Sequence, residues 1–184
     1  MASSRAFTIF VLLLIAPFPQ FQGQATTILH FKSFSPFSTA LETLQKQLGY
    51  SFKNIGLLRR AVTHASFSEE NNKALSILGA NVIEASVSFR SLSKDIDVSS
   101  KELNHQLSQI SNVESSCAVD GMRLALHKVV RVSPKTNSSV PAVVCSAFRA
   151  IFGAVAIDDG KSDAAGDIFW TFHRGRELGN VLPL

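Results

Sequence analysis

The chain has 184 residues, of which 46% are hydrophobic and 17% are charged, and its formal net charge is +4. This length fits one domain of ordinary size and argues against two full domains, while the apolar fraction excludes wholesale disorder. Two cysteines are too few for a disulfide framework or a four-cysteine zinc site. The basic balance is mild, and no dense stripe of Lys and Arg is present. Composition therefore permits contact with nucleic acid without requiring it.

The first 25 residues have the order of a secretory signal peptide. Residues 1–5 are basic and free of acids, residues 6–16 are almost continuously apolar, and residues 23–25 offer small side chains for cleavage. The apolar run of about ten residues is too short for the ~20 that a membrane-spanning helix needs. We therefore expect entry into the secretory pathway, to the endoplasmic reticulum or beyond. A transit peptide to mitochondrion or plastid and an uncleaved anchor are the alternatives. After removal of the signal, no membrane span is expected.

Residues 26–38 show no regular period and are expected to be a flexible lead-in to a domain spanning residues 39–180. Thr39 and Glu42 form a capping box that predicts a helix ending at Gly49, and Asn54 predicts the cap of a second helix. These signals are local, so they predict where helices begin and end rather than how the helices pack.

The longest apolar period covers residues 73–92, and it predicts a helix that is buried centrally because apolar side chains surround most of it. Capping boxes at 99–102 and 111–114 predict two further helices. A polar loop at 133–141 then precedes an almost uninterrupted apolar helix from Pro141 to Ala156.

Ser162 begins the last expected helix, and residues 129–132 are the single weak candidate for a strand. The predicted fold class is therefore all-α, a bundle of about seven helices.

Three segments in this order resemble the ribonuclease III domain. Residues 48–66 resemble its opening helices. Residues 72–80 read Asn-Lys-Ala-Leu-Ser-Ile-Leu-Gly-Ala, where the family signature reads Asn-Glu-Arg-Leu-Glu-Phe-Leu-Gly-Asp. Residues 146–155 are similar to the family's Asp-Thr-Val-Glu-Ala-Leu-Ile-Gly-Gly-Val helix. The resemblance covers about residues 41–178. It implies a ribonuclease III-like helical bundle, a homodimer and Mg²⁺-dependent cleavage of double-stranded RNA. No double-strand-RNA-binding domain is expected after the last helix.

The departures from this family affect its metal-binding acids. In the family, acidic side chains on two facing helices hold magnesium ions. Here those positions hold Ser76 and Ala80, four apart on one helix, and Ser146 and Arg149, three apart on the other. Lys73 occupies a further acidic position of the signature. Hydroxyls beside a guanidinium do not supply the anionic oxygens that Mg²⁺ requires. We therefore expect no catalytic residue, no metal site, no cofactor and no double-strand cleavage.

Other acids do not restore the cluster. Glu84 lies one turn beyond Ala80, but a single displaced carboxylate does not rebuild a site for two metal ions. Lys73 and Arg149 could instead contact a phosphate, which would make double-stranded RNA a weak partner. The alternative is that Arg149 pairs with a nearby acid.

Two features bear on the compartment. Cys117 and Cys145 lie on helices that pack together in the family fold, so a disulfide is one expectation and two buried free thiols are the other. Asn137-Ser138-Ser139 is a glycosylation sequon in the polar loop. Both expectations are conditional on entry into the secretory pathway.

The leading hypothesis is a catalytically silent ribonuclease III-like domain that serves as a binding or scaffold module with an unknown protein partner. Small plant members of the family have the same plan of a targeting segment and one such domain. That resemblance implies a role in karyogamy, the fusion of nuclei. The alternatives are a degenerate endoribonuclease of RNA processing, with acids supplied by a partner subunit, and a factor associated with organellar ribosomes.

Overall fold

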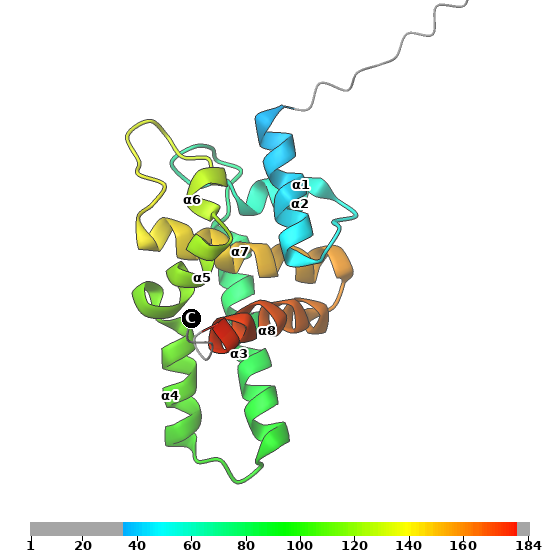
Figure 1. Cartoon of the computed structure of the whole chain (residues 1–184), viewed down its shortest axis with the longest axis vertical. Helices are drawn as coiled ribbons and strands as arrows, with labels where there is room; N and C mark the ends of the chain where they lie inside the picture. Colours follow the sequence, from blue (N-terminus) through cyan, green and yellow to red (C-terminus); the bar gives the residue numbers. More distant parts are fainter. Residues whose placement is uncertain (1–34, 180–184) are drawn as a thin grey trace, which may run out of the picture. The chain divides into compact units, whose positions relative to one another are not determined.

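The computed structural model describes residues 35–179. The expected signal segment, residues 1–25, and the lead-in up to residue 34 lie outside the described residues. Within the described part, the chain forms α1 (Pro36–Leu48), α2 (Ile55–Ala61), α3 (Lys73–Lys94), α4 (Ser100–Ser111), the π-helix η1 (Val113–Cys117), α5 (Ala118–Arg123), α6 (Leu126–Val129), α7 (Pro141–Asp159) and α8 (Ser162–Gly179) (Figure 1). The all-α fold class is confirmed.

Several helix ends lie where their capping residues predict. Asn54 accepts a hydrogen bond from the backbone N–H of Gly56, and Ser99 accepts one from that of Glu102. Gly49 has a φ of 65° and ends α1 in the left-handed region, which glycine enters without steric cost.

The start of α1 corrects the expected lead-in of residues 26–38. Helix α1 begins at Pro36, because Ser35 accepts a hydrogen bond from the N–H of Ser38 and Pro36 suits a first helical turn. The capping box at Thr39 therefore lies inside the helix rather than at its beginning.

The region between α4 and α7 also differs from expectation. Asn112, not Ser111, caps the helix that follows α4, and this helix begins as a π-helix before α5. Helix α6 ends at Val129, so the strand candidate of residues 129–132 begins at the last residue of that helix and continues as extended chain. The extended pairing there is a single isolated bridge between Thr63 and Arg131.

The central helix is α7 rather than α3. Eleven residues of α7 are buried, including Phe148 and Phe152, whose rings pack edge to face. By length and composition α7 is apolar enough to cross a membrane, contrary to the expectation of no such stretch, but most of it is buried as the core of this domain. On α3, by contrast, Ile77 is 67% and Phe89 is 75% exposed.

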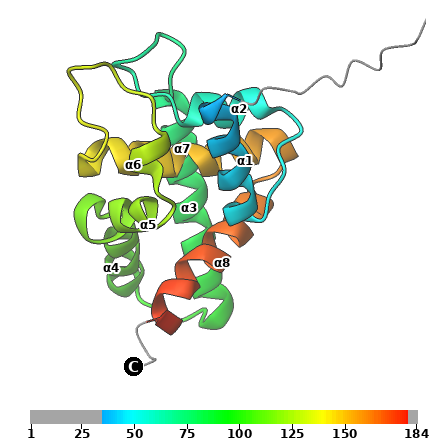
Figure 2. The same ribbon diagram turned by 45° about the horizontal axis from the view of Figure 1, so that its top comes forward.

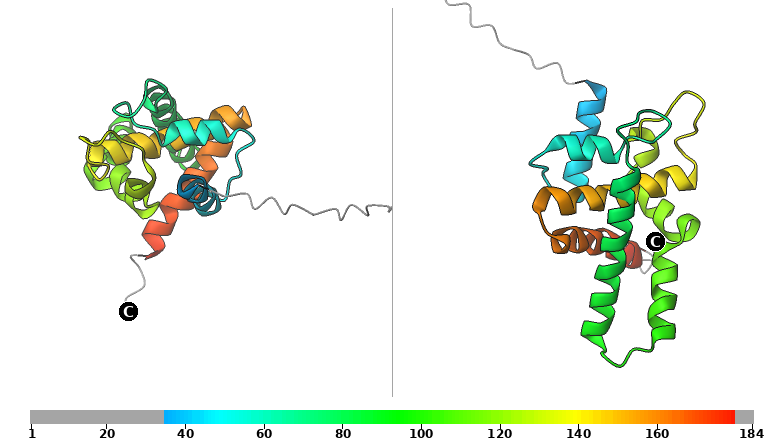
Figure 3. Two further views of the ribbon diagram at one scale, coloured as in Figure 1. Left: turned by 90° about the horizontal axis from the view of Figure 1, so that it is seen from above. Right: turned by 180° about the vertical axis from the view of Figure 1, so that it is seen from behind.

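Helices α3 and α7 cross closely, as the right-hand view of Figure 3 shows from behind. One glycine of each helix lies at the crossing. A Cβ at Gly79 would overlap the carbonyl oxygen of Arg149, and one at Gly153 would overlap that of Leu75. The two backbones therefore touch where no side chain separates them, which brings residues 75–79 of α3 against residues 149–153 of α7.

The end of α7 is tied to the connection between α1 and α2, at the right of the molecule in Figure 2. The Asp158 carboxylate accepts hydrogen bonds from the Tyr50 hydroxyl at 2.9 Å and from the backbone N–H groups of Lys53 and Asn54, each at 2.8 Å. This arrangement is called the Asp158 latch below.

Candidate functional site

The glycine crossing places the four family positions together. Ser76 and Ala80 lie on α3, and Ser146 and Arg149 lie on α7; all four are half-buried. Lys73 is the first residue of α3 and is exposed. Ala80 and Arg149 line one small cavity, and Ser146 contacts Asn72 at the beginning of α3. That all four positions face a single cleft stays a prediction.

The donor set of this cleft does not fit magnesium. Two hydroxyls, a methyl group and a guanidinium offer no anionic oxygen ligand. Within residues 35–179, no three His, Cys, Asp or Glu side chains come together in a group that could hold a metal ion. The cavity beside these positions is lined by Ala80, Ser111, Arg149 and Asp120, and its volume of about 10 Å³ is close to the minimum for one water molecule. The Asp120 carboxylate is hydrogen-bonded to His173.

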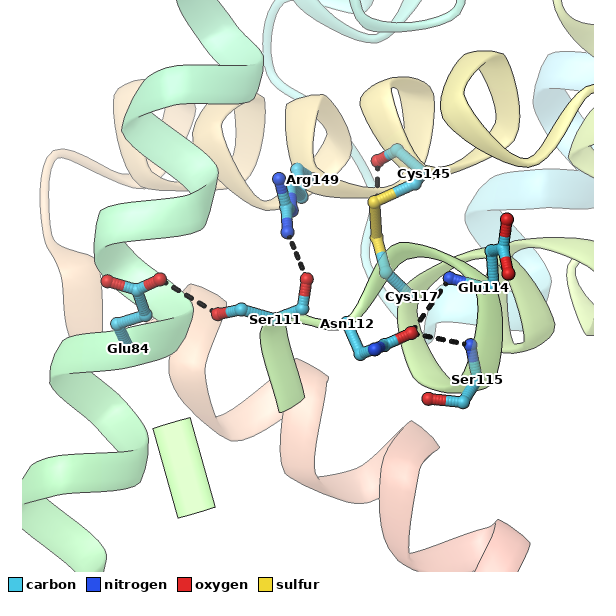
Figure 4. Close-up of a disulfide and its surroundings, with 8 residues drawn as sticks. All are labelled: Glu84, Ser111, Asn112, Glu114, Ser115, Cys117, Cys145 and Arg149. Atoms are coloured by element: carbon cyan, nitrogen blue, oxygen red, sulfur yellow. Dashed lines mark hydrogen bonds between the residues drawn. A yellow bond between two sulfur atoms is a disulfide. The ribbon is translucent and has the colours of Figure 1, made fainter. Parts of the chain in front are cut away.

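Arg149 crosses the cleft and binds the end of α4. Its Nη2 donates a hydrogen bond to the carbonyl oxygen of Ser111 at 2.7 Å, and the Ser111 hydroxyl donates to Oε1 of Glu84 at 2.8 Å (Figure 4). Ser111 ends α4, so its carbonyl has no partner within that helix and attracts a cation. These three residues, called the Ser111 clasp, connect α3, α4 and α7.

Sequence reasoning missed Ser111 in this role, because the residue had been assigned to the cap of the next helix. The partner of Glu84 in the clasp is the hydroxyl of Ser111 rather than a cation. Two features of the sequence point toward the clasp: the end of a helix that a capping box predicts, and an arginine at one of the family's cleft positions. That the two lie close together is seen only in the structure.

A disulfide joins Cys117, at the end of η1, to Cys145 on α7, beside the clasp (Figure 4). The Cα atoms are 5.1 Å apart, within the range that a disulfide requires. The wall of the cleft formed by η1 is thus fixed to the central helix covalently as well as by packing.

The remaining expected site residues lie apart from one another. Ser146 donates a long hydrogen bond of 3.5 Å to Oδ1 of Asn72, whose buried Nδ2 has no partner within the described residues. Asn137 is exposed in the loop between α6 and α7. The geometry leaves Lys73 free to meet solvent, whereas Arg149 is bound to Ser111, so a joint phosphate contact stays a prediction.

An all-α domain whose two longest helices cross at glycines, with the positions of the family's metal-binding acids on those two helices, is the arrangement expected of a ribonuclease III nuclease domain. The chain belongs to the ribonuclease III-like family, because the family model described as Ribonuclease-III-like matches residues 54–172.

The relatives include a plant protein and bacterial enzymes. The chain is 58% identical over 150 residues to Protein NUCLEAR FUSION DEFECTIVE 2 of Arabidopsis thaliana, covering 82% of this chain and 78% of that one. It is 32% identical over 125 residues to Ribonuclease 3 of Aquifex aeolicus, covering 66% of this chain and 54% of the enzyme. The chain thus spans about half the length of the bacterial relatives that it matches.

The fold is also similar to solved nuclease domains. Two structures of the ribonuclease III nuclease domain from Campylobacter jejuni match with TM-scores of 0.69 and 0.67 at 26% identity. They cover 73% and 78% of this chain and nearly all of the bacterial domain. One of these structures is described as showing flexibility in a region involved in dimer formation.

Proposed function

We propose that this domain does not cleave RNA and acts as a dimeric binding or scaffold module. The observation that carries the proposal is the Ser111 clasp, in which a former acidic position holds a hydrogen-bond donor committed to protein backbone. Cleavage of this type depends on metal ions that activate water and stabilise the leaving oxygen. The four family positions carry no carboxylate to hold them, and Asp120, a carboxylate that lines the adjoining cavity, is paired with His173 and Arg123.

The test is incubation of the purified protein with long duplex RNA and Mg²⁺ or Mn²⁺. No cleavage product is expected, and a Glu84→Gln variant should behave in the same way. Metal-dependent cutting that disappears in Glu84→Gln would overturn the proposal and favour the alternative of a degenerate endoribonuclease. Filter binding across a salt series, with Lys73→Ala as the variant, measures any backbone contact separately, because phosphate contacts weaken as salt rises.

The proposal includes a homodimer formed through α3. Ala74, Ile77, Asn81, Ala85 and Phe89 recur every three or four residues and are all exposed, so they form one unpartnered face of the helix. A second copy is the proposed occupant, since the bacterial nuclease domain of the same fold is described as forming dimers.

Analytical ultracentrifugation tests the dimer. Ile77→Asp should shift the protein to monomer, because a charge cannot be buried unpaired in an apolar interface. Ile157→Asp, at an apolar position on α7 that is also exposed, is the matched control and should leave the dimer intact. A wild-type monomer, or a dimer that survives Ile77→Asp, would contradict this part of the proposal.

At the level of the organism, we propose a role in karyogamy. This rests on the 58% identity to a relative named for a defect in nuclear fusion. Expression of this chain in Arabidopsis plants that lack the relative should restore nuclear fusion. Failure of a well-expressed, correctly located chain to do so would contradict the role.

For the compartment, we propose entry into the secretory pathway and glycosylation of Asn137. Its Oδ1 accepts a hydrogen bond from the backbone N–H of Ser139 at 2.9 Å, which holds the exposed sequon in a tight turn. Residues 1–34 fused to a fluorescent reporter should locate in the endoplasmic reticulum, and import into mitochondria or plastids would overturn this proposal. Glycosidase treatment of the secreted chain should lower its apparent mass, and the variant Asn137→Gln should lack that change.

A further inference from the structure

A groove between α4, η1 and α8 adjoins the cavity of the Ser111 clasp, with which it shares Ile110 and Ser116, and plays no part in the proposed function. It has a volume of about 660 Å³, within the range of small-molecule sites. His105, Gln109, Asn112, Ser115, Trp170 and His173 supply its polar lining.

His173, which lines the groove, is paired on its other side with a buried carboxylate outside the groove. Asp120 is 1% exposed, and Nδ1 of His173 donates to its Oδ2 at 2.8 Å. Arg123 lies at 3.5 Å from the other carboxylate oxygen. A buried ion pair is weak evidence of stabilisation, because removing the charges from water offsets their attraction. Stability alone therefore gives no reason for a carboxylate in this core.

The pair fixes the orientation of the His173 ring. The ring is stacked on Phe169, with the two planes 15° apart and the centroids at 5.2 Å. Nδ1 of His173 is bonded to Asp120. The other ring nitrogen, Nε2, is therefore the atom with which His173 can hydrogen-bond a ligand in the groove that it lines. A carboxylate behind an imidazole sets its tautomer in the same way at many functional sites.

The other walls are rigid and present neutral polar groups. Asn112 accepts hydrogen bonds from the N–H groups of Glu114 and Ser115, which orders the beginning of η1, and the disulfide at Cys117 fixes its end. Gln109 is hydrogen-bonded to His105 at 3.0 Å along α4. A π-helix is rare and is often found at functional sites.

The lining chemistry selects a class of ligand. Among the described side chains of the groove there is no Lys, Arg, Asp or Glu, so it offers no counter-charge to a phosphate, a carboxylate or an ammonium group. Amides, hydroxyls and imidazoles instead match a molecule with many hydroxyl groups, while Val87, Ile110 and the indole of Trp170 provide apolar contact. Arg90 covers one face of that indole at 4.5 Å.

We infer that this groove binds a neutral carbohydrate of one to three sugar units. The inference goes beyond the proposed scaffold function and holds whether or not the chain cleaves RNA. Hydroxyl pairs of the sugar would bond the amides of Gln109 and Asn112 and Nε2 of His173, and its apolar face would lie on the aliphatic floor.

The chain contains one tryptophan, so Trp170 reports on the groove alone. The full chain, expressed in eukaryotic cells and purified as the host processes it, is titrated with cellobiose, mannobiose or lactose. At least one should produce a saturable change in tryptophan fluorescence and shift the indole N–H resonance. The double variant His105→Ala, Gln109→Ala should bind about tenfold more weakly or worse, as loss of hydrogen bonds predicts.

Controls separate binding from folding. The altered side chains are exposed or at the rim, so the double variant should retain the wild-type circular dichroism spectrum, and Gln47→Ala, an exposed position on α1, should bind normally. His173→Gln should also weaken binding. Absence of a saturable response to all three sugars at high millimolar concentration would overturn the inference. So would equal binding by the double variant, or a response to adenosine or glucose 6-phosphate but not to the neutral sugars.

Discussion

Arg149 shows how one residue can change the chemistry of a cleft. A carboxylate at this position would face the free carbonyl at the end of α4, where two acceptors repel each other. The guanidinium donates to that carbonyl instead, and Ser111 passes the connection on to Glu84. Position 149, where the family has a metal-binding acid, therefore carries a side chain that connects α3, α4 and α7.

This role predicts a loss of stability when the guanidinium is removed. Arg149→Met keeps much of the aliphatic length but leaves the carbonyl of Ser111 without its donor, which should lower the free energy of unfolding by about 1–3 kcal/mol. Urea denaturation followed by circular dichroism measures the change. Arg59→Met, at an exposed position on α2, is the control, and equal stability of the two variants would contradict the clasp.

At the scale of helices, the Asp158 latch connects the end of α7 to the α1–α2 connection. Burial raises the pKa of Asp158, but hydrogen bonds from Asn54, Lys53 and Tyr50 outweigh that effect and hold the pKa below its ordinary value. A lowered folded pKa means that the latch stabilises the fold above the unfolded pKa, near 4, and that this contribution is lost as the pH falls through the folded value.

Asp158→Asn should therefore be less stable than the wild type at neutral pH. The amide NH₂ group would replace one carboxylate oxygen and would face the N–H and O–H donors that this oxygen accepts from. The difference should shrink below about pH 4. Denaturation midpoints measured from pH 3 to pH 7 test this. A constant difference across that range would mean that ionisation of Asp158 plays no part.

The same latch has an alkaline signature. Burial, followed by the hydrogen bond to Asp158, raises the pKa of Tyr50 to about 12. Tyr50 is the single tyrosine of the chain, so phenolate absorbance reports it directly. The wild-type midpoint should lie near 12 and should fall toward the ordinary value in Asp158→Asn; an unchanged midpoint would show that the two groups are not coupled.

Local signals predicted much of the helical plan. Asn54, Gly49 and Ser99 act on backbone groups within a few residues of themselves, so their effects can be read from the sequence. The Ser111 clasp could not be predicted in this way, because its bonds join residues 27 and 38 positions apart. Whether α3 or α7 is the central helix depends likewise on packing between distant residues. One face of α3 stays exposed, so α7 is the more buried of the two.

For the whole molecule, the disulfide links the redox state to stability. It closes a loop with a sequence separation of 28, and constraint of the unfolded chain over such a loop is worth about 3–4 kcal/mol. The protein as isolated should contain no free thiol under denaturing conditions, and dithiothreitol should lower its urea midpoint. The double variant Cys117→Ser, Cys145→Ser should not respond to dithiothreitol. Two titratable thiols in the isolated protein would contradict an oxidised form.

The central claim is that the cleft of this family member holds no metal ion, and Mn²⁺ binding followed by electron paramagnetic resonance tests it most directly. The matched comparison is a variant carrying Lys73→Glu, Ser76→Glu, Ala80→Asp, Ser146→Asp and Arg149→Glu together. We expect the wild type to leave Mn²⁺ free in solution and the variant, where it folds, to bind it. Saturable binding of Mn²⁺ by the wild type that is lost in Glu84→Gln would contradict the account.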